Sequence, residues 1–147
     1  MKQKRFSLQT VLDLRVKARE KAEDDVAKAI RDRDIAAARC AEAIARLDEL
    51  TRMITGERFA AYVREQGWNA INAQRDLLRT LEARLLQAEK KVSAQREILI
   101  AADRDQKLVE KLKEKWATAQ DLEFARYEEK QLEDFVTAAR FLQSATT

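Results

Sequence analysis

The sequence predicts an all-α protein in which two long helices fold back on each other as an antiparallel coiled-coil hairpin. The first observation is that the 147 residues contain no proline and only two glycines, Gly56 and Gly67. The second is the composition: charged residues make up 37% and aromatic residues 6%, so strong helix formers dominate and a deep core is not expected. The third is that apolar residues recur in steps of three and four on both sides of the glycines, as on the buried face of a helix.

The first helix is expected from about residue 7 to about residue 55, with Ser7 as its N-cap. From Val26 to Ile54 the apolar steps alternate between four and three, a heptad pattern that predicts a left-handed supercoil. Residues beside this seam widen the apolar stripe to a third column: Ala29, Ala36, Ala43 and Leu50. The predicted seam consists of Val26, Ile30, Arg33, Ala37, Cys40, Ile44, Leu47, Thr51 and Ile54.

Two seam residues of this helix allow alternatives. Cys40 is interpreted as a small buried apolar residue, the other possibility being a redox-active or dimer-forming thiol. Arg33 either turns its head group to the surface or sets the register against a polar seam residue such as Gln95.

A turn region is expected over about residues 56–70. Either glycine could end the first helix in a left-handed conformation, and the sequence does not decide between them. Asn69 or Asn72 could cap the next helix. Trp68 either closes the tip or is an exposed anchor for a partner.

The second helix is expected from about residue 71 to about residue 142. Its predicted seam consists of Leu78, Leu81, Leu85, Ala88, Val92, Gln95, Leu99 and Ala102, then Leu108, Val109, Leu112, Trp116 and Ala119, and finally Leu132, Phe135, Ala139 and Leu142.

The two predicted arms of this single hairpin, which takes in residues 1–147, are unequal in length. At about 1.5 Å per residue the first is roughly 80 Å and the second roughly 105–110 Å long. We therefore expect the end of the second helix to extend beyond the pairing. This end carries Phe124, Tyr127, Phe135 and Phe141, which predicts a docking surface. A parallel homodimer without a hairpin is the structural alternative.

The composition also excludes several classes of function. The chain has no histidine, which excludes catalytic triads and zinc sites with histidine ligands, and two glycines cannot form a phosphate-binding loop. We therefore expect no enzyme, no cofactor, no metal and no small-molecule substrate. The single cysteine excludes an intrachain disulfide and fits a reducing compartment.

Neither a membrane nor a nucleic acid is an expected partner. No apolar run is long enough to span a membrane and no signal peptide is present, so the expected location is the cytoplasm. The net charge of +3 comes from Lys2, Lys4 and Arg5, and charges of both signs are mixed elsewhere. This pattern favours a solvated helix surface over a nucleic-acid interface.

Three segments carry a resemblance to a known family. They are the opening residues 6–15 (FSLQTVLDLR) and the charged stretches 110–115 (EKLKEK) and 128–134 (EEKQLED). Together with the length and the position of the break, they resemble flagellar export proteins of the FliJ type over nearly the whole chain. The family tends towards Leu-Asp-Glu where this chain has Leu132-Glu133-Asp134.

The resemblance implies a component of the flagellar type III protein export apparatus, cytoplasmic and peripherally associated with the inner membrane. Members of the family resemble the coiled coil of the rotary ATP synthase gamma subunit. They bind the export ATPase hexamer and promote its assembly and activity, contact the cytoplasmic domain of the export gate, and interact with export substrate chaperones. The alternatives are the counterpart in a virulence injectisome, a generic coiled-coil adaptor or scaffold, and a basic helical protein that binds nucleic acid.

The resemblance also implies contact residues at the two ends of the hairpin. By analogy with the rotary stalk, the end with both termini enters the ATPase pore and the glycine-bearing tip faces the export gate. The candidate ATPase contacts are Phe6, Leu8, Leu12, Arg15, Arg19, Glu128, Lys130 and Phe135. The candidate gate contacts are Leu50, Met53, Trp68, Leu77 and Leu81, for which ordinary seam packing is the alternative.

Overall fold

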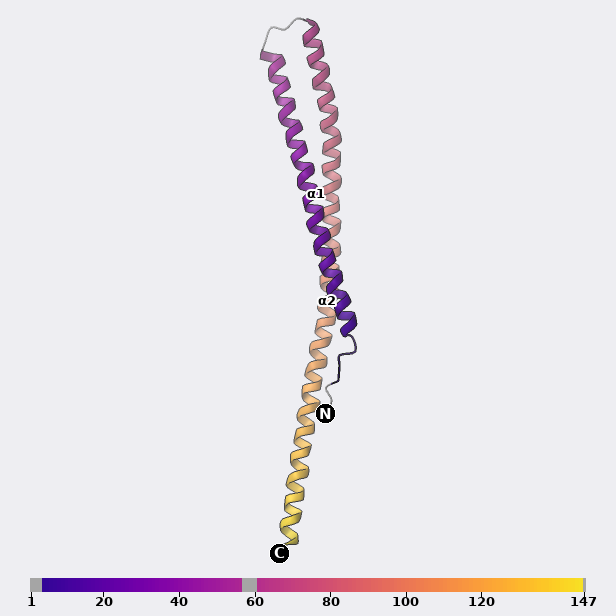
Figure 1. Cartoon of the computed structure of the whole chain (residues 1–147), viewed down its shortest axis with the longest axis vertical. Helices are drawn as coiled ribbons and strands as arrows, with labels where there is room; N and C mark the ends of the chain where they lie inside the picture. The colour runs from indigo at the N-terminus through magenta and orange to yellow at the C-terminus, as the bar shows by residue number, and fades with distance from the viewer. Residues whose placement is uncertain (1–3, 57–60, 147) are drawn as a thin grey trace. The chain divides into compact units, whose positions relative to one another are not determined.

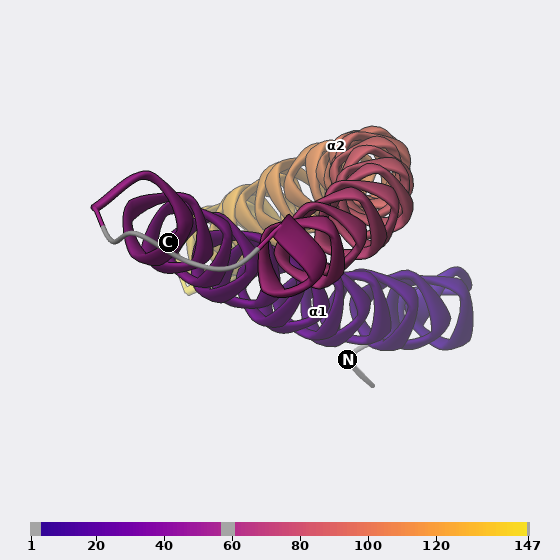
Figure 2. The same ribbon diagram turned by 90° about the horizontal axis from the view of Figure 1, so that it is seen from above.

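The computed structural model describes residues 4–56 and 61–146. Two long α-helices, α1 (Gln9–Gly56) and α2 (Ala61–Ala145), make up nearly all of this part and pack against each other (Figure 1). The described residues contain no β-strand. Figure 2 gives the same two helices seen from above. The predicted all-α fold with two packed helices is therefore confirmed.

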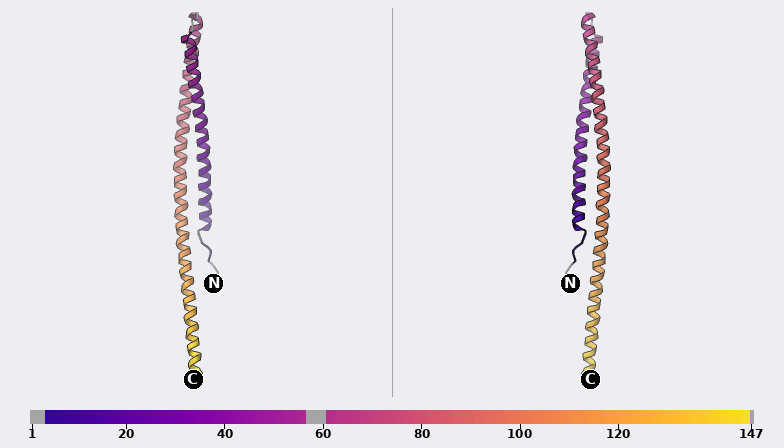
Figure 3. Two further views of the ribbon diagram at one scale, coloured as in Figure 1. Left: turned by 90° about the vertical axis from the view of Figure 1, so that its left-hand side faces the viewer. Right: turned by 90° about the vertical axis from the view of Figure 1, so that its right-hand side faces the viewer.

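The chain divides into two compact units, which are described separately. Residues 17–103 form the first, called here the hairpin unit, and residues 1–16 with 104–147 form the second, called the terminal unit. In the hairpin unit, α1 and α2 lie side by side and run in opposite directions (Figure 3). That the whole chain forms one hairpin stays a prediction.

The helix boundaries differ from the expected ones mainly at the start of α2. This helix begins at Ala61, about ten residues earlier than expected, so Gly67, Asn69 and Asn72 lie inside it and cap nothing. No glycine in the described residues has a positive φ, so the predicted left-handed helix end is wrong for both glycines. The helices are joined by residues 57–60, which lie outside the described residues, as does Lys2.

The start of α1 is displaced by one position from its expected cap. Ser7 and Leu8 form a turn in which the backbone N–H of Gln9 donates to the Phe6 carbonyl at 3.2 Å. The N–H of Leu12 donates to the Leu8 carbonyl at 2.9 Å, so Leu8 occupies the N-cap position and not Ser7. Such a shift is within the usual uncertainty of a helix end.

Gly67 has a packing role in place of the predicted turn role. A Cβ at this position would lie 2.6 Å from Ile54 Cδ1 and 2.8 Å from Ile54 Cγ1, closer than carbon atoms approach. The missing side chain therefore lets α2 pass close to Ile54 near the end of α1. A Cβ at Gly56 would meet open space, so Gly56 has no comparable contact.

The seam of α2 in the hairpin unit agrees with the predicted one. Its buried and partly buried residues alternate by steps of four and three from Gly67 onwards, as expected for heptad packing. Ile71 is completely buried and the prediction for residues 78–102 is confirmed. The whole seam of α2 in this unit is Gly67, Ile71, Gln74, Leu78, Leu81, Leu85, Ala88, Val92, Gln95, Leu99 and Ala102.

The seam of α1 agrees with the prediction in one column and departs from it in the other. The column Val26, Arg33, Cys40, Leu47 and Ile54 is buried or partly buried as predicted. The predicted third column of Ala29, Ala36, Ala43 and Leu50 is buried or partly buried, and Ala22 continues it. In the other predicted column Ile30 and Thr51 are partly buried, but Ala37 and Ile44 are exposed, so the placing of those two in the seam was wrong.

The size of alanine explains this difference. Ala22, Ala29 and Ala43 are each at most 5% exposed, whereas Ile44 is 46% exposed. A column of methyl groups lets two helices approach more closely than a column of isoleucines would. Gln74 of α2 comes near enough for its Nε2 to donate to the Ala43 carbonyl at 3.4 Å.

The two open questions about seam residues of α1 receive answers in the hairpin unit. Cys40 is buried, in agreement with its interpretation as a small apolar residue. The Arg33 side chain bonds Asp34 of its own helix, with Nη2 3.0 Å from Oδ1. This pairing fits the turn of the guanidinium towards the surface and leaves Gln95 out of the interaction.

The terminal unit has a smaller apolar seam and several polar contacts. Leu12 and Val109 are buried, and the rings of Phe6 and Trp116 lie 5.6 Å apart between centroids at an interplanar angle of 51°. Ion pairs join Arg15 Nη1 to Asp105 Oδ2 at 3.3 Å and Lys4 Nζ to Glu123 Oε2 at 3.7 Å. These contacts attach the N-terminal segment to α2.

The heptad of α2 continues through the terminal unit, but polar residues occupy it. Its buried and partly buried positions here are Gln106, Val109, Lys113, Trp116 and Gln120. The predicted seam residues Leu108, Leu112 and Ala119 are exposed, so those three assignments were wrong. Every described residue after Gln120 is exposed, which also overturns the seam role predicted for Leu132, Phe135, Ala139 and Leu142.

Candidate interaction surfaces

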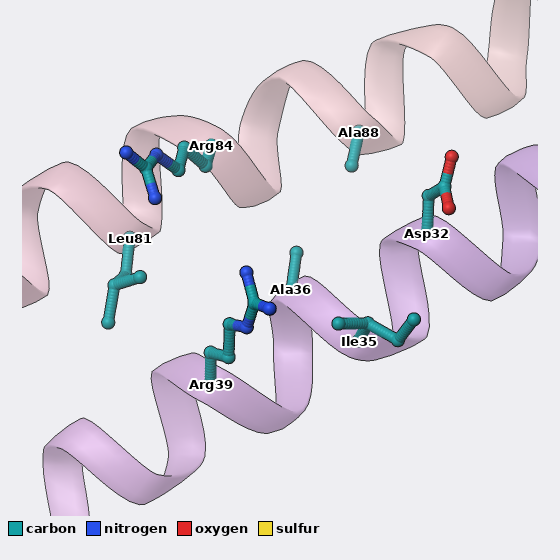
Figure 4. A pocket seen from close by; sticks show the side chains of 7 residues that line it. All are labelled: Asp32, Ile35, Ala36, Arg39, Leu81, Arg84 and Ala88. Atoms are coloured by element: carbon teal, nitrogen blue, oxygen red, sulfur yellow. The ribbon is translucent and has the colours of Figure 1, made fainter.

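Two adjoining hollows form a groove between α1 and α2 in the hairpin unit. One, of about 370 Å³, is lined by Asp32, Ile35, Ala36, Arg39, Leu81, Arg84 and Ala88 (Figure 4). The other, of about 220 Å³, is lined by Arg39, Glu42, Ala43, Arg46, Gln74, Leu77 and Leu81. Because both include Arg39 and Leu81, they form one continuous surface, called here the inter-helix groove.

The alanine column of α1 creates this groove. Ala36 and Ala43 fill little of the space between the helices, so the larger side chains beside them stand as walls. Ile35 and Leu77 on these walls are about half exposed. The groove therefore offers apolar surface to a partner.

The charges of the groove are carried mainly by arginines. Arg39 projects from α1 and Arg84 from α2, on opposite sides of the first hollow, while Asp32 lies towards its other end (Figure 4). Among the described residues, Arg39, Arg46 and Arg84 form no ion pair. Three guanidinium groups are thus available for acidic side chains.

The second surface is the exposed end of α2, residues 121–145 in the terminal unit, called here the tail helix. Its four predicted aromatic residues are all exposed, and Phe135 and Phe141 are each 73% exposed. Leu132, Phe135, Val136, Ala139 and Leu142 follow the spacing of one helix face and form an apolar stripe. Residues 121–145 contain six acidic and three basic side chains, a net charge of −3.

The structure separates the predicted ATPase contacts into two groups. In the N-terminal half of the chain, Phe6 packs on Trp116, Leu12 is buried and Arg15 is paired with Asp105. Arg19 Nε lies 3.7 Å from Glu23 Oε1 and is buried without a hydrogen-bond partner in the described residues. The Leu8 side chain is 37% exposed. Phe6, Leu12 and Arg19 are thus used in packing and Arg15 in an exposed ion pair, whereas Leu8 is exposed.

The other group lies on the tail helix. Glu128, Lys130 and Phe135 are exposed and have no partner among the described residues. Together with Leu8, they are the predicted ATPase contacts that remain available to another protein.

The predicted gate contacts lie in the hairpin unit, and two of them line the inter-helix groove. Leu77 is exposed and Leu81 partly buried on the α2 side of the groove. Met53 and Trp68 are exposed outside it, and Leu50 is partly buried in the seam. Exposure of Trp68 favours the anchor over the closed tip as its role.

The sequence reasoning missed the arginines of the groove. Arg39, Arg46 and Arg84 flank the seam and look like ordinary surface residues in the sequence. Their signal was the alanine at every seventh position beside them, which predicts a shallow seam with high walls once it is recognised as the packing column.

The described residues contain no group of three side chains placed to hold a metal ion. Neither α1 nor α2 has, within those residues, an apolar stretch that could cross a membrane.

Comparison with known proteins assigns a family. A family model described as flagellar FliJ protein matches residues 3–145 of the chain. No curated protein and no solved structure matches it.

Proposed function

This chain belongs to the flagellar FliJ protein family, a component of the flagellar export apparatus, and on that premise we propose that it is the stalk of the export ATPase. In this role it is a non-catalytic partner that binds the ATPase hexamer, promotes its assembly and activity, and links it to the export gate and substrate chaperones. It acts in the cytoplasm, attached peripherally to the apparatus in the inner membrane.

The uncovered tail helix is the observation that carries the proposal. An isolated helix has little stability in water, and its apolar stripe gains stability only when a partner covers it. Phe135 and Leu132 supply the apolar contact, and the mixed charges around them supply exposed ion pairs. Such pairs are worth only about 0–1 kcal/mol each, so a stalk could exchange them between successive subunits of a ring.

The test is the effect of the purified chain on its cognate export ATPase. We expect added protein to raise both ATP turnover and the fraction of hexamer. Phe135→Asp removes an apolar contact worth about 1.5–3 kcal/mol and should weaken the stimulation roughly tenfold or more. Ile98→Asp, at an exposed position of the hairpin unit, adds the same charge and should stimulate normally.

A chain that binds specific partners but leaves turnover and hexamer assembly unchanged would contradict the stalk and support the adaptor alternative. Stimulation of an injectisome ATPase with equal strength would instead favour the injectisome counterpart.

The gate contact is assigned in this proposal to the inter-helix groove. What supports it is the pair Leu77 and Leu81, both in the groove wall. Leu77→Asp should weaken binding of the cytoplasmic domain of the gate about tenfold in titration calorimetry. Leu86→Asp is the matched control, because Leu86 is equally exposed on α2 and lines neither hollow. Equal loss in both variants would remove the groove from the proposal.

A further inference from the structure

We propose that the inter-helix groove receives the tail helix of a second copy of this chain. The inference goes beyond the proposed function because it needs no other protein. It joins the two surfaces that the structure leaves uncovered, one on each unit.

The occupant has to be a second copy and not the same chain. The wall residues Leu81 and Arg84 and the tail residues belong to one uninterrupted helix, α2. A tail helix could reach the groove of its own chain only by breaking α2. In a pair of chains the tail helix of one copy can enter the groove of the other, which gives a dimer.

The lengths of the two surfaces correspond. The groove extends along α1 from Asp32 to Arg46, which at about 1.5 Å per residue is roughly 21 Å. On the tail helix, the stretch from Glu128 to Leu142 covers the same number of residues and the same distance. The tail helix is therefore long enough to cover the groove.

The apolar surfaces also correspond. The stripe presents large side chains, of which Phe135 and Leu142 are among the most exposed in the chain. The groove presents small side chains at its floor, Ala36, Ala43 and Ala88, between larger walls. Large residues against a floor of alanines is the arrangement by which an amphipathic helix occupies a groove.

The charges favour contact between the tail helix and the groove over contact between two tail helices. The tail helix carries −3 while the whole chain carries +3, so two tail helices repel each other and each is attracted to the rest of the other chain. Glu128 and Glu129 stand about one turn before Leu132, at the head of the stripe. In the groove they would meet Arg39 and Arg84, which have no ion-pair partner in the described part of the chain.

The proposal makes the dimer and the stalk mutually exclusive. The tail helix cannot lie in a groove and contact an ATPase ring through Phe135 at the same time. Self-association would thus cover the groove and the tail helix until a protein that binds the tail helix more tightly displaces the second copy.

The experiment is sedimentation equilibrium of the full chain between about 5 and 500 µM, with circular dichroism to confirm equal helicity of all variants. We expect the wild type to shift from monomer to dimer in this range. The groove variant Arg39→Glu with Arg84→Glu should raise the dissociation constant at least tenfold, and so should the tail variant Glu128→Lys with Glu129→Lys. All four changes in one chain restore opposite charges and should bring the constant back to within about threefold of the wild type.

Two control variants have the same charge changes away from the contact. Arg31→Glu with Arg75→Glu changes exposed arginines that line neither hollow. Glu133→Lys with Asp134→Lys changes acids on the side of the tail helix opposite the stripe, since residues on a helix advance by about 100°. Both should stay within about threefold of the wild type.

Three results would overturn the proposal. They are a wild type that remains monomeric throughout the range, a control that dissociates as much as its test variant, and a four-fold variant that does not regain association. The first would mean that a different protein covers the groove. None of the three affects the proposed function, because this experiment contains no ATPase and no gate.

Discussion

The two units use the same heptad of α2 with different residues. In the hairpin unit, one column of the seam is Ile71, Leu78, Leu85, Val92 and Leu99, all apolar. In the terminal unit the same column continues, at the same spacing of seven, as Gln106, Lys113 and Gln120. Spacing alone therefore determines which face of the helix is covered, whereas the residues on that face determine how firmly it is held.

The difference in residues implies a difference in stability. The hairpin seam buries aliphatic side chains continuously, and each contributes through the area that it removes from water. The N-terminal segment is attached by one aromatic contact, a few apolar residues and exposed ion pairs, which contribute little. We expect the N-terminal segment to open locally at a lower free energy than the hairpin unit.

The largest effect on the free energy of unfolding is expected when one buried aliphatic residue from each unit is replaced by alanine. Ile71→Ala should reduce the free energy of unfolding by about 2–4 kcal/mol, because it leaves a cavity at the most buried position of the hairpin seam. Leu12→Ala should cost less than about 1 kcal/mol in the same urea titration, since local opening releases Leu12 before global unfolding. Equal losses in the free energy of unfolding would contradict the difference and show that the two units unfold in one cooperative transition.

The next effect is expected at the glycines. Gly56→Ala should raise stability by about 0.5–1 kcal/mol through the helix propensity of alanine, because its Cβ meets open space. Gly67→Ala gains the same propensity but displaces Ile54, so we expect a net loss of about 1–2 kcal/mol. Adding Ile54→Val, which removes Cδ1, should recover part of that loss. Stabilisation by Gly67→Ala alone would show that Ile54 moves aside freely.

A smaller effect with the opposite sign is expected in the terminal unit. Gln106 is buried, its Nε2 donates to Glu110 Oε1 at 2.8 Å, and its Oε1 has no partner in the described residues. Gln106→Leu removes the unpaired oxygen and should stabilise the terminal unit by about 1 kcal/mol. Slower hydrogen exchange at the amides of residues 9–16 would report this gain.

The matched change in the hairpin unit is Gln74→Leu. It removes the hydrogen bond from Gln74 to the Ala43 carbonyl, so we expect little or no gain there. A gain of equal size at both positions would mean that the polarity of the seam does not distinguish the units.

The smallest effect is expected for the ion pair between Arg15 and Asp105. Both side chains are about half exposed, so their coupling should be below about 1 kcal/mol. A double-mutant cycle with Arg15→Ala and Asp105→Ala measures it, and raised salt should reduce it further. A coupling of several kcal/mol would make this pair the main attachment of the N-terminal segment.

The fold could be predicted from the sequence wherever a large apolar residue recurs at heptad spacing. Leu78, Leu81, Leu85 and Leu99 mark the seam of α2 in the hairpin unit without ambiguity. In α1 the prediction placed Ile44 in the seam because it is strongly apolar, but close packing favours the smaller Ala43 next to it, and Ile44 is exposed. Hydrophobicity ranks residues by transfer from water and takes no account of how near two helices can come.

The remaining errors have the same kind of cause. Leu108 and Leu112 were placed inside because they are apolar, yet the heptad that begins at Gly67 passes through Gln106 and Lys113. Gly67 was interpreted as a helix end because glycine often ends helices, while here it permits a close contact with Ile54. The exposed tail could be predicted from unequal arm lengths. The groove was missed because the alanine column was treated as the side of the stripe and not as the column that packs closest to the partner helix.

The burial of Cys40 has a practical consequence. It is the only cysteine in the chain, and it is buried at the seam position that follows Ala36 and precedes Ala43. A thiol reagent can reach it only when the two helices separate, so the rate of modification counts opening events of the hairpin unit. The Cys40 thiol is therefore a built-in reporter of how often the two helices separate, and it needs no added label.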